Sequence, residues 1–207
     1  MARTDVSIVN IALSRLGVTT PITALTDTTS EQAIQANLIY ETVRDSLVSE
    51  YPWRFATKHA PLSEVMADLY QTEYSYVYSY PSDCLRILRV YSEGTEFDDG
   101  RHEHEVYLTD CMYCEGEEQK VIATDLADAH ADYIAQVTDP EQFSPLFADC
   151  LSWRMASELS VPLARDFDKR QHLMEIYMHT LDSAREVDMQ EGYRRWRKSG
   201  GRYASKR

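Results

Sequence analysis

The sequence predicts an α+β protein: a mainly helical bundle with an inserted small antiparallel β domain and an extended C-terminal tail. Three observations predict this fold class. Apolar residues recur at helical spacing near both ends of the chain, residues alternate in the middle, and the last residues lack an apolar stripe. The predicted parts are residues 1–62 for the N-terminal helices, 63–138 for the β-rich insertion, 139–190 for the C-terminal helices, and 191–207 for the tail.

Two helices are predicted in the first part. Residues 5–16 place apolar side chains on one face, and Gly17 should end this helix. The second helix should begin at a capping box, with Thr29 as its first residue and Gln32 at the third helical position. Its apolar spacing continues to Tyr51, after which proline ends it.

Short strands are predicted in the middle part. The segments with strand-like alternation or composition are 74–80, 84–91, 105–108, 110–114 and 133–137. Glycines fall between several of them, as expected at turns. Because neighbouring residues of a strand face opposite sides, this pattern indicates a small, mostly antiparallel sheet or barrel.

Helices are predicted again after residue 138. Asp139 followed by Pro140 is a typical helix start, with the aspartate as N-cap. Pro162 should break this helix, and a last helix should run from about residue 164 to 190. Since neither helical block could bury its apolar stripe alone, the two are expected to pack on each other.

The chain has 207 residues and a net charge of −13, which is unevenly distributed. Segment 92–118 holds ten acidic residues and one arginine, a charge of −9. Residues 191–207 hold seven Lys or Arg and one Glu, a charge of +6, which leaves −19 on the rest. Such a body should repel nucleic acid, because phosphate binding needs Lys and Arg. Binding of single strands by the basic aromatic tail is one alternative function.

Features that would direct the chain to a membrane or to secretion are not found in the sequence. Its longest apolar runs are far shorter than a membrane span, and the first residues lack a signal-peptide core. The four cysteines are too few and too irregularly spaced for a secreted disulfide framework. We therefore expect free thiols and a cytoplasmic site of synthesis.

Catalytic and metal-binding motifs are sparse. Cys111 and Cys114 form a C-x-x-C, and His102 and His104 lie upstream, so four possible zinc ligands share one segment. Structural zinc sites usually pair two such knuckles, and His-x-His also fits a strand, so we expect no metal. Nucleophile-elbow, P-loop, dinucleotide-binding and metalloprotease motifs are absent from the sequence. Binding or assembly is favoured over catalysis, and no catalytic residue or cofactor is assigned.

The stretch YPWRFATKHAPL, residues 51–62, carries an unusual amount of aromatic surface for a helix end. Pro52, Trp53 and Phe55 are therefore assigned to a structural junction. Trp53 is expected to pack into the core of its own chain. Phe55 could lie in that core or at a seam between subunits.

Several different motifs follow one another in a definite order along the chain. The motifs are Leu16-Gly17 at a helix end, Ser30-Glu31 at a helix start, Arg44-Asp45, the junction Pro52-Trp53-Arg54-Phe55-Ala56, YSYPSDCLRILRVY, and YIAQVTDPEQFSPLF. In their order and spacing they resemble the tail tubular protein A family of short-tailed bacteriophages, the head-to-tail adaptors. The resemblance covers most of the chain but includes neither the tail nor the Cys/His segment.

The resemblance implies a structural protein of the virion that is assembled in the host cytoplasm. Such adaptors form a dodecameric ring under the portal of a filled capsid, extend the DNA channel and carry the tail nozzle, through which the genome is ejected. The implied partners are further copies of the chain, the portal protein, the nozzle protein, and double-stranded DNA that passes without specific binding. No membrane, cofactor or catalytic residue is implied.

Two groups of residues are candidates for contacts in such an assembly. Arginine and aromatic residues are enriched at interface hot spots, so the tail is assigned to portal docking. Its candidate residues are Tyr193, Arg194, Arg195, Trp196, Arg197, Arg202 and Tyr203. Candidates for acidic residues that face the channel or nozzle are Asp98, Asp99, Glu103 and Glu105. The alternatives are a tail-completion or stopper protein of the same connector, and a small hydrolase that uses the acidic, His-rich segment.

Overall fold

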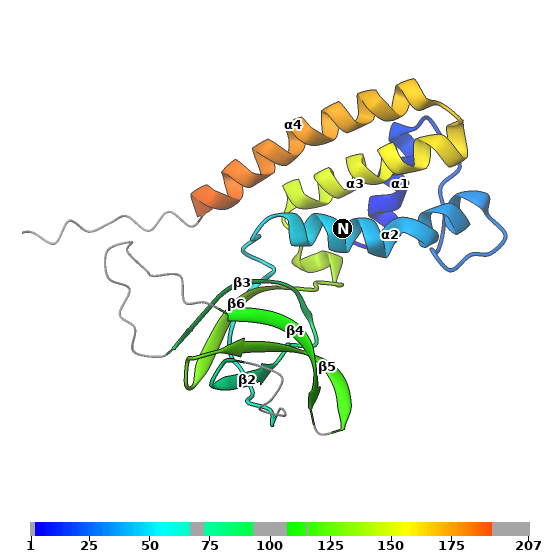
Figure 1. Ribbon diagram of the computed structural model, residues 1–207. Coiled ribbons are helices and arrows are strands. Elements are labelled where there is room, and N and C mark those ends of the chain that lie inside the picture. Colours follow the sequence, from blue (N-terminus) through cyan, green and yellow to red (C-terminus); the bar gives the residue numbers. More distant parts are fainter. Residues whose placement is uncertain (1–2, 67–72, 93–106, 115, 192–207) are drawn as a thin grey trace, which may run out of the picture.

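The computed structural model describes residues 3–66, 73–92, 107–114 and 116–191, and shows a layer of helices above two antiparallel sheets (Figure 1). The predicted fold class, a mainly helical bundle with a small β insertion, is wrong. The structure is mixed, 47% helical and 25% strand, and its described strands form two separate three-stranded sheets. The reason is that one sheet completes the hydrophobic core beneath the helices instead of projecting from a finished bundle. The predicted tail lies outside the described residues.

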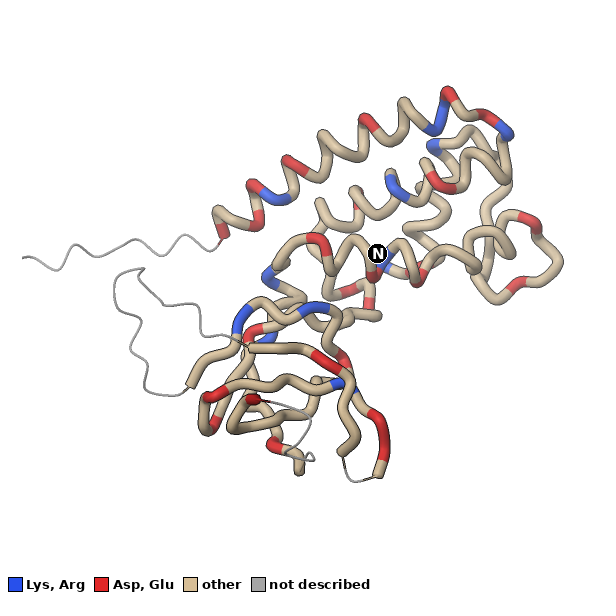
Figure 2. Tube along the Cα trace, viewed as in Figure 1, with Lys and Arg blue, Asp and Glu red and all other residues tan. Residues whose placement is uncertain are grey.

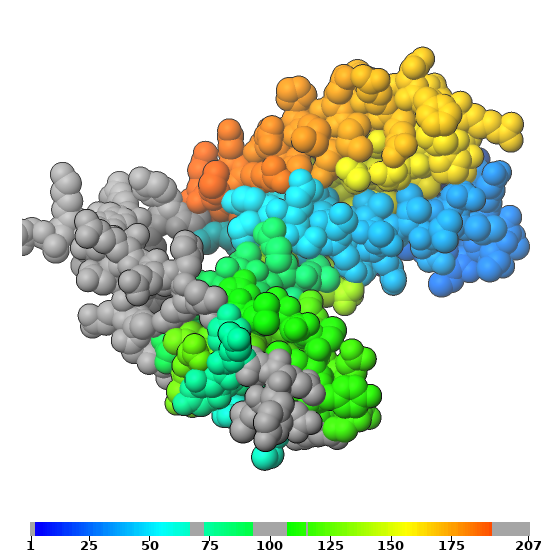
Figure 3. All heavy atoms as spheres, viewed as in Figure 1, coloured from blue at the N-terminus to red at the C-terminus, as the bar shows by residue number. Residues whose placement is uncertain are grey.

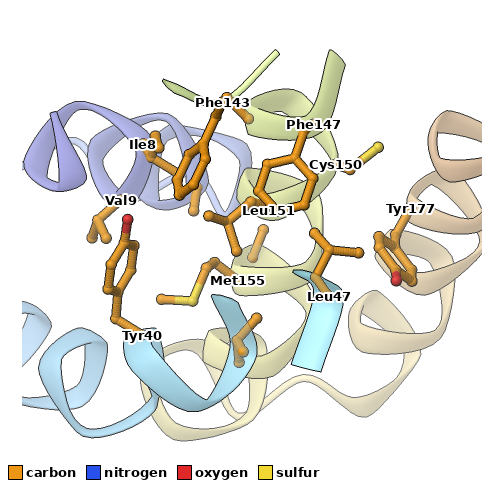
Figure 4. Close-up of a cluster of buried hydrophobic side chains, with 14 of the residues drawn as sticks. Ile8, Val9, Tyr40, Leu47, Phe143, Phe147, Cys150, Leu151, Met155 and Tyr177 are labelled. Carbon is orange, nitrogen blue, oxygen red and sulfur yellow. The ribbon is translucent and has the colours of Figure 1, made fainter. Parts of the chain in front are cut away.

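The helical layer is built around one central helix. Its helices are α1 (Asp5–Arg15), α2 (Glu31–Glu50), α3 (Pro145–Leu159) and α4 (Phe167–Glu191). Helix α3 packs against the other three, and Figure 4 shows its Phe147, Leu151 and Met155 among side chains from α1 and α2. The two ends of the chain therefore meet in one core, as the apolar stripes predict.

Helix ends follow local chemistry, with corrections of a few residues. The prediction that Gly17 ends the first helix is confirmed, and its φ of 81° explains why glycine stands there. Ser30, not Thr29, caps α2, because the Ser30 hydroxyl accepts from the backbone N–H of Ala33. The predicted start at Asp139 produces only a short 3₁₀ turn, η1 (Pro140–Gln142). Helix α3 then begins after a second cap, Ser144.

The connection between α3 and α4 is a short π-helix, η2 (Ser160–Ala164), which contains Pro162. Proline lacks the N–H of an ordinary helix and its ring crowds the preceding turn. Arg165 then adopts the left-handed conformation, with φ of 52°, and reverses the chain direction. The predicted break at Pro162 is confirmed.

The strands form two sheets of equal size, here called sheet A and sheet B. Sheet A has the order β1 (Thr57–Pro61), β6 (Ala129–Ala135), β3 (Cys84–Ser92). Sheet B has the order β2 (Tyr76–Ser79), β5 (Glu117–Thr124), β4 (Tyr107–Cys114), and all strand pairs in both sheets are antiparallel. Strands β1 and β5 were not predicted from the sequence, and β1 lies inside the range 1–62 assigned to helices.

Sheet A is the layer that joins the two halves of the core. On β6, Ile134 belongs to the same buried cluster as the helices. Ala131, Tyr133 and Ala135 alternate with it and form a separate small cluster on the opposite side. Any group on the helix-facing side of sheet A is consequently held at a fixed position relative to the helical layer.

Candidate interaction surfaces

The junction after α2 is a sharp and well-determined turn. Because Pro52 disfavours helical backbone in the residue before it, Tyr51 adopts an extended conformation and α2 ends at Glu50. The Trp53 carbonyl then accepts the backbone N–H groups of Ala56 and Thr57, at 3.0 and 2.9 Å. This turn leads directly into β1.

The aromatic rings of the junction are covered by the chain itself. Trp53 is 0% exposed, and its indole N–H donates to the carbonyl of Leu47 at 3.0 Å. Its ring meets Phe147 of α3 edge to face, with centroids 5.2 Å apart. Phe55 is half-buried and contacts Phe143 and Phe147. The junction therefore fixes the helical layer to sheet A within one subunit.

A groove of about 480 Å³ opens beside this junction, at the C-terminal end of α4. The carboxylate of Asp188 lies at its wall, where the residue is only 7% exposed and accepts the backbone N–H of Arg54 at 3.3 Å. Burial raises the pKa of the Asp188 carboxyl above its ordinary value. The residues that line the groove are Tyr51, Pro52, Arg54, Thr57, His59, Asp188 and Met189.

Next to the groove, the helix-facing side of sheet A carries a polar cluster. Asp132 of β6 is 4% exposed, and its two carboxylate oxygens pair with His59 of β1 and Arg89 of β3. A buried carboxylate requires such partners. The pair of His59 and Asp132 resembles the general base of a hydrolase and the carboxylate that orients it. A nucleophile that could attack a substrate is not among these contacts.

Two of the four thiols are unsuited to catalysis. Burial raises the pKa of the Cys84 thiol, and raises that of Cys150 to about 12. Because the thiolate is the reactive form, both cysteines are held in their unreactive state at neutral pH. They are packing residues of sheet A and of α3.

The C-x-x-C motif lies on β4, with Cys111 exposed and Cys114 buried. A spacing of three residues on a strand places the two sulfur atoms on opposite faces, so they cannot share an ion. Within the described ranges, no group of three His, Cys, Asp or Glu side chains could hold a metal. His102 and His104 lie outside those ranges.

We expect protein purified without chelator to contain no zinc. The physical reason is the strand geometry of Cys111 and Cys114, which leaves one thiol in the core of sheet B. Elemental analysis by mass spectrometry measures the metal content directly. About one zinc per chain that is lost in a Cys111→Ser variant would contradict this prediction.

Two sets of large apolar side chains are exposed on the helical layer. On α2, Ile34 and Leu38 are one turn apart and 46% and 74% exposed. On α4, Phe167, Met178 and Met189 are spaced by about three turns each and so share one side of the helix. Figure 3 shows α2 and α4 at the surface, with α3 largely covered between them.

The residues assigned to contacts from the sequence alone fall into two groups. Of the junction residues, Trp53 and Phe55 contact Phe147 of α3, and Pro52 lines the groove. The seven tail candidates at 193–197, 202 and 203, and the acidic candidates at 98, 99, 103 and 105, lie outside the described residues. Sequence analysis missed the groove, the Asp132 cluster and the exposed apolar sets, because each depends on long-range packing.

Comparisons with known proteins do not assign the chain to a family. No family model matches the sequence, and no curated protein matches it either. Among the described helices, none is long and apolar enough to cross a membrane.

Proposed function

We propose that this protein is the structural head-to-tail adaptor of a short-tailed bacteriophage. Copies of the chain form a ring under the portal, extend the DNA channel and carry the tail nozzle. The protein has no catalytic role in this proposal. The observation that carries the proposal is the ordered series of sequence motifs that resembles the tail tubular protein A family.

The position of the most distinctive motif supports the proposal. Pro52-Trp53-Arg54-Phe55-Ala56 forms the joint that fixes the helices over sheet A, with Trp53 fully buried. A subunit that transmits a fixed geometry from one ring to the next needs such a rigid joint between its two halves. The motif therefore has a mechanical role that suits an adaptor.

The exposed apolar residues support self-association. A ring of identical subunits needs a heterologous interface, in which two different patches of one chain meet on neighbouring copies. The α2 pair and the α4 set are two such patches on different helices. We propose that they contribute to the seam between subunits.

A substitution in the α2 pair tests this seam. Leu38→Asp should change the unfolding free energy by less than about 0.5 kcal/mol, because Leu38 is 74% exposed. It should nevertheless weaken self-association, since a charge at an apolar seam must be desolvated. Sedimentation velocity measures the assembly state, and Met66→Asp, at a position 83% exposed on the sheet side, is the control. If the Leu38→Asp variant assembles as well as the unchanged chain, α2 is not part of the seam.

Net charge supports a conduit that does not hold DNA. A charge of −19 outside the tail repels a passing duplex at distances up to about 10 Å, the screening length at 0.1 M salt. The candidates Asp98, Asp99, Glu103 and Glu105 are proposed to face the channel or nozzle.

Neutralising those four acidic residues to Asn and Gln should leave the protein folded and should increase duplex binding at low salt, because repulsion is removed. The matched control removes the same charge from exposed positions of α4: Asp168, Glu175, Asp182 and Glu186. Circular dichroism checks folding, and fluorescence anisotropy with labelled DNA measures binding. If duplex binding increases more in the control variant, the acidic segment does not face the DNA.

The number of copies in the virion distinguishes the proposal from its closest alternative. If the protein is a dodecameric adaptor, each particle should contain about a dozen copies. If it is a stopper or tail-completion protein of different symmetry, the number of copies should differ. Quantitative mass spectrometry of purified particles measures this number against the portal protein.

A further inference from the structure

The helix-facing side of sheet A carries a concentration of exposed basic side chains, which is unexpected in a chain of net charge −13. These side chains form what we name the basic track: Arg54, His59, Arg86 and Arg89. Figure 2 shows blue segments on β3 and on the connection from α2 to β1. The track begins at the groove, whose lining includes Arg54 and His59.

Two irregularities in β3 create the track. Its register with β6 shifts between Cys84 and Arg86 and again between Ile87 and Arg89, so an extra leucine is inserted each time. These leucines, Leu85 and Leu88, pack against the helical core. Each following arginine stands opposite one residue of β6 and is exposed. Bulges of this kind re-aim side chains, and here they place two arginines beside the core on one side of the sheet.

Among the residues that the structure describes, the acidic groups in contact with the track are hidden from solvent, whereas the basic groups face it. Asp132 and Asp188 are 4% and 7% exposed. In contrast, the side chains of His59 and Arg89 are 63% and 45% exposed. A ligand that approaches from solvent therefore meets the basic groups first.

Two of the arginines make no close polar contact with the described part of the chain through their guanidinium groups. Within the residues that the structure describes, the guanidinium groups of Arg54 and Arg86 make no ion pair or hydrogen bond. Arg54 interacts favourably with the charge of the buried Asp188 carboxylate, and both guanidinium groups keep all their hydrogen-bond donors available, which points to an anionic ligand.

We propose that the basic track binds an acidic segment of a partner protein in extended conformation. Arginine forks recognise carboxylates with paired hydrogen bonds, and clusters of arginine are a recurring means of binding acidic motifs. The track crosses three strands, a width of roughly 10 Å, which three or four residues of extended chain can span. Tyr51 and Pro52 in the groove offer apolar contacts at one end.

A protein segment fits this surface better than nucleic acid does. A duplex would extend past the track and meet the strongly acidic body, whereas a short peptide would not. The inference goes beyond the proposed function and does not depend on ring assembly, since the whole track lies on one chain.

The test uses the full-length chain and a fluorescein-labelled peptide of ten alternating Glu and Asp residues, measured by anisotropy at low salt. A Gln/Asn peptide of the same length and a ten-nucleotide single-stranded DNA are the comparison ligands. We expect the acidic peptide to bind and the Gln/Asn peptide not to bind. The Arg54→Ala/Arg86→Ala double variant should bind the acidic peptide about tenfold more weakly, since hydrogen bonds to charged groups are lost.

The control is Arg165→Ala, which removes an exposed arginine on the far side of the helical layer, between α3 and α4. It should bind as the unchanged chain does, and both variants should keep the same melting temperature. Equal affinity of the double variant and the Arg165→Ala variant would overturn the proposal. Tighter binding of the DNA than of the peptide, lost in the double variant, would also overturn it in favour of a nucleic-acid site.

Discussion

Replacing Trp53 with alanine is expected to destabilise the isolated subunit by about 3–5 kcal/mol. The side chain is fully buried, and its removal leaves a cavity between the junction and Phe147 of α3. It also leaves the Leu47 carbonyl, at the last turn of α2, without its indole partner. For a chain of this size the change should lower the melting temperature by about 6–20 °C.

Urea denaturation of the subunit, at a concentration where it is monomeric, measures this loss. Trp153→Ala is the matched control, because Trp153 is only partly buried and lies under the guanidinium of Arg15. The loss of unfolding free energy in the Trp153→Ala variant should be clearly smaller than in Trp53→Ala. If Trp53→Ala keeps the stability of the monomer and only abolishes assembly, the junction acts between subunits rather than within one.

Removing the tail is expected to abolish docking on the portal without unfolding the subunit. A chain that ends at Gln190 keeps all but the last residue of α4, including the buried Leu181, Ala184 and Asp188. The residues removed carry seven Lys or Arg and three aromatic side chains, the composition of an interface anchor. Because each copy contributes modestly and the contact repeats around the ring, the loss should be cooperative.

Two substituted tails separate the contributions to docking. One variant replaces Arg194, Arg195, Arg197 and Arg202 with Gln, and it should dock weakly at every salt concentration. The other replaces Tyr193, Trp196 and Tyr203 with Ala, and its remaining attraction should weaken steeply with salt. Surface plasmon resonance on immobilised portal measures both. If the truncated chain docks on the portal as tightly as the full chain does, the tail is not the anchor.

Local chemistry explains what the sequence could predict. Gly17, Pro52 and Pro162 end or interrupt helices because of their own backbone properties, so their effects appear within one or two residues. The apolar stripe of α3 likewise predicts which face of that helix is buried. The expected burial of Trp53 follows from its size at a chain reversal.

Pairing between strands that are distant in the sequence explains most of the elements that were not predicted. Strand β1, with the sequence TKHAP, has mostly exposed or half-buried side chains and carries Lys58 and Pro61, so nothing local marks it as a strand. It forms because β6, more than sixty residues later, pairs with its full length. Strand β5 begins with four polar residues, and only its last four residues are buried. The separation into two sheets also depends on such pairings.

The basic track could not be predicted for a related reason. Arg86 and Arg89 lie three residues apart, a spacing that would place them on opposite faces of a regular strand. Only the bulge at Leu88, which lies between them, brings them to one side. His59 and Arg54 join them through the pairing of β1 with β6, which was itself not predicted.

The central claim, that this chain is a ring-forming adaptor, is tested most directly by electron microscopy of the purified full-length protein, alone and mixed with the candidate portal protein. We expect closed rings of uniform size on one face of the portal, coaxial with its channel, and no such complex with the chain truncated after Gln190. A protein that stays monomeric at high concentration and leaves every portal particle bare would contradict the claim.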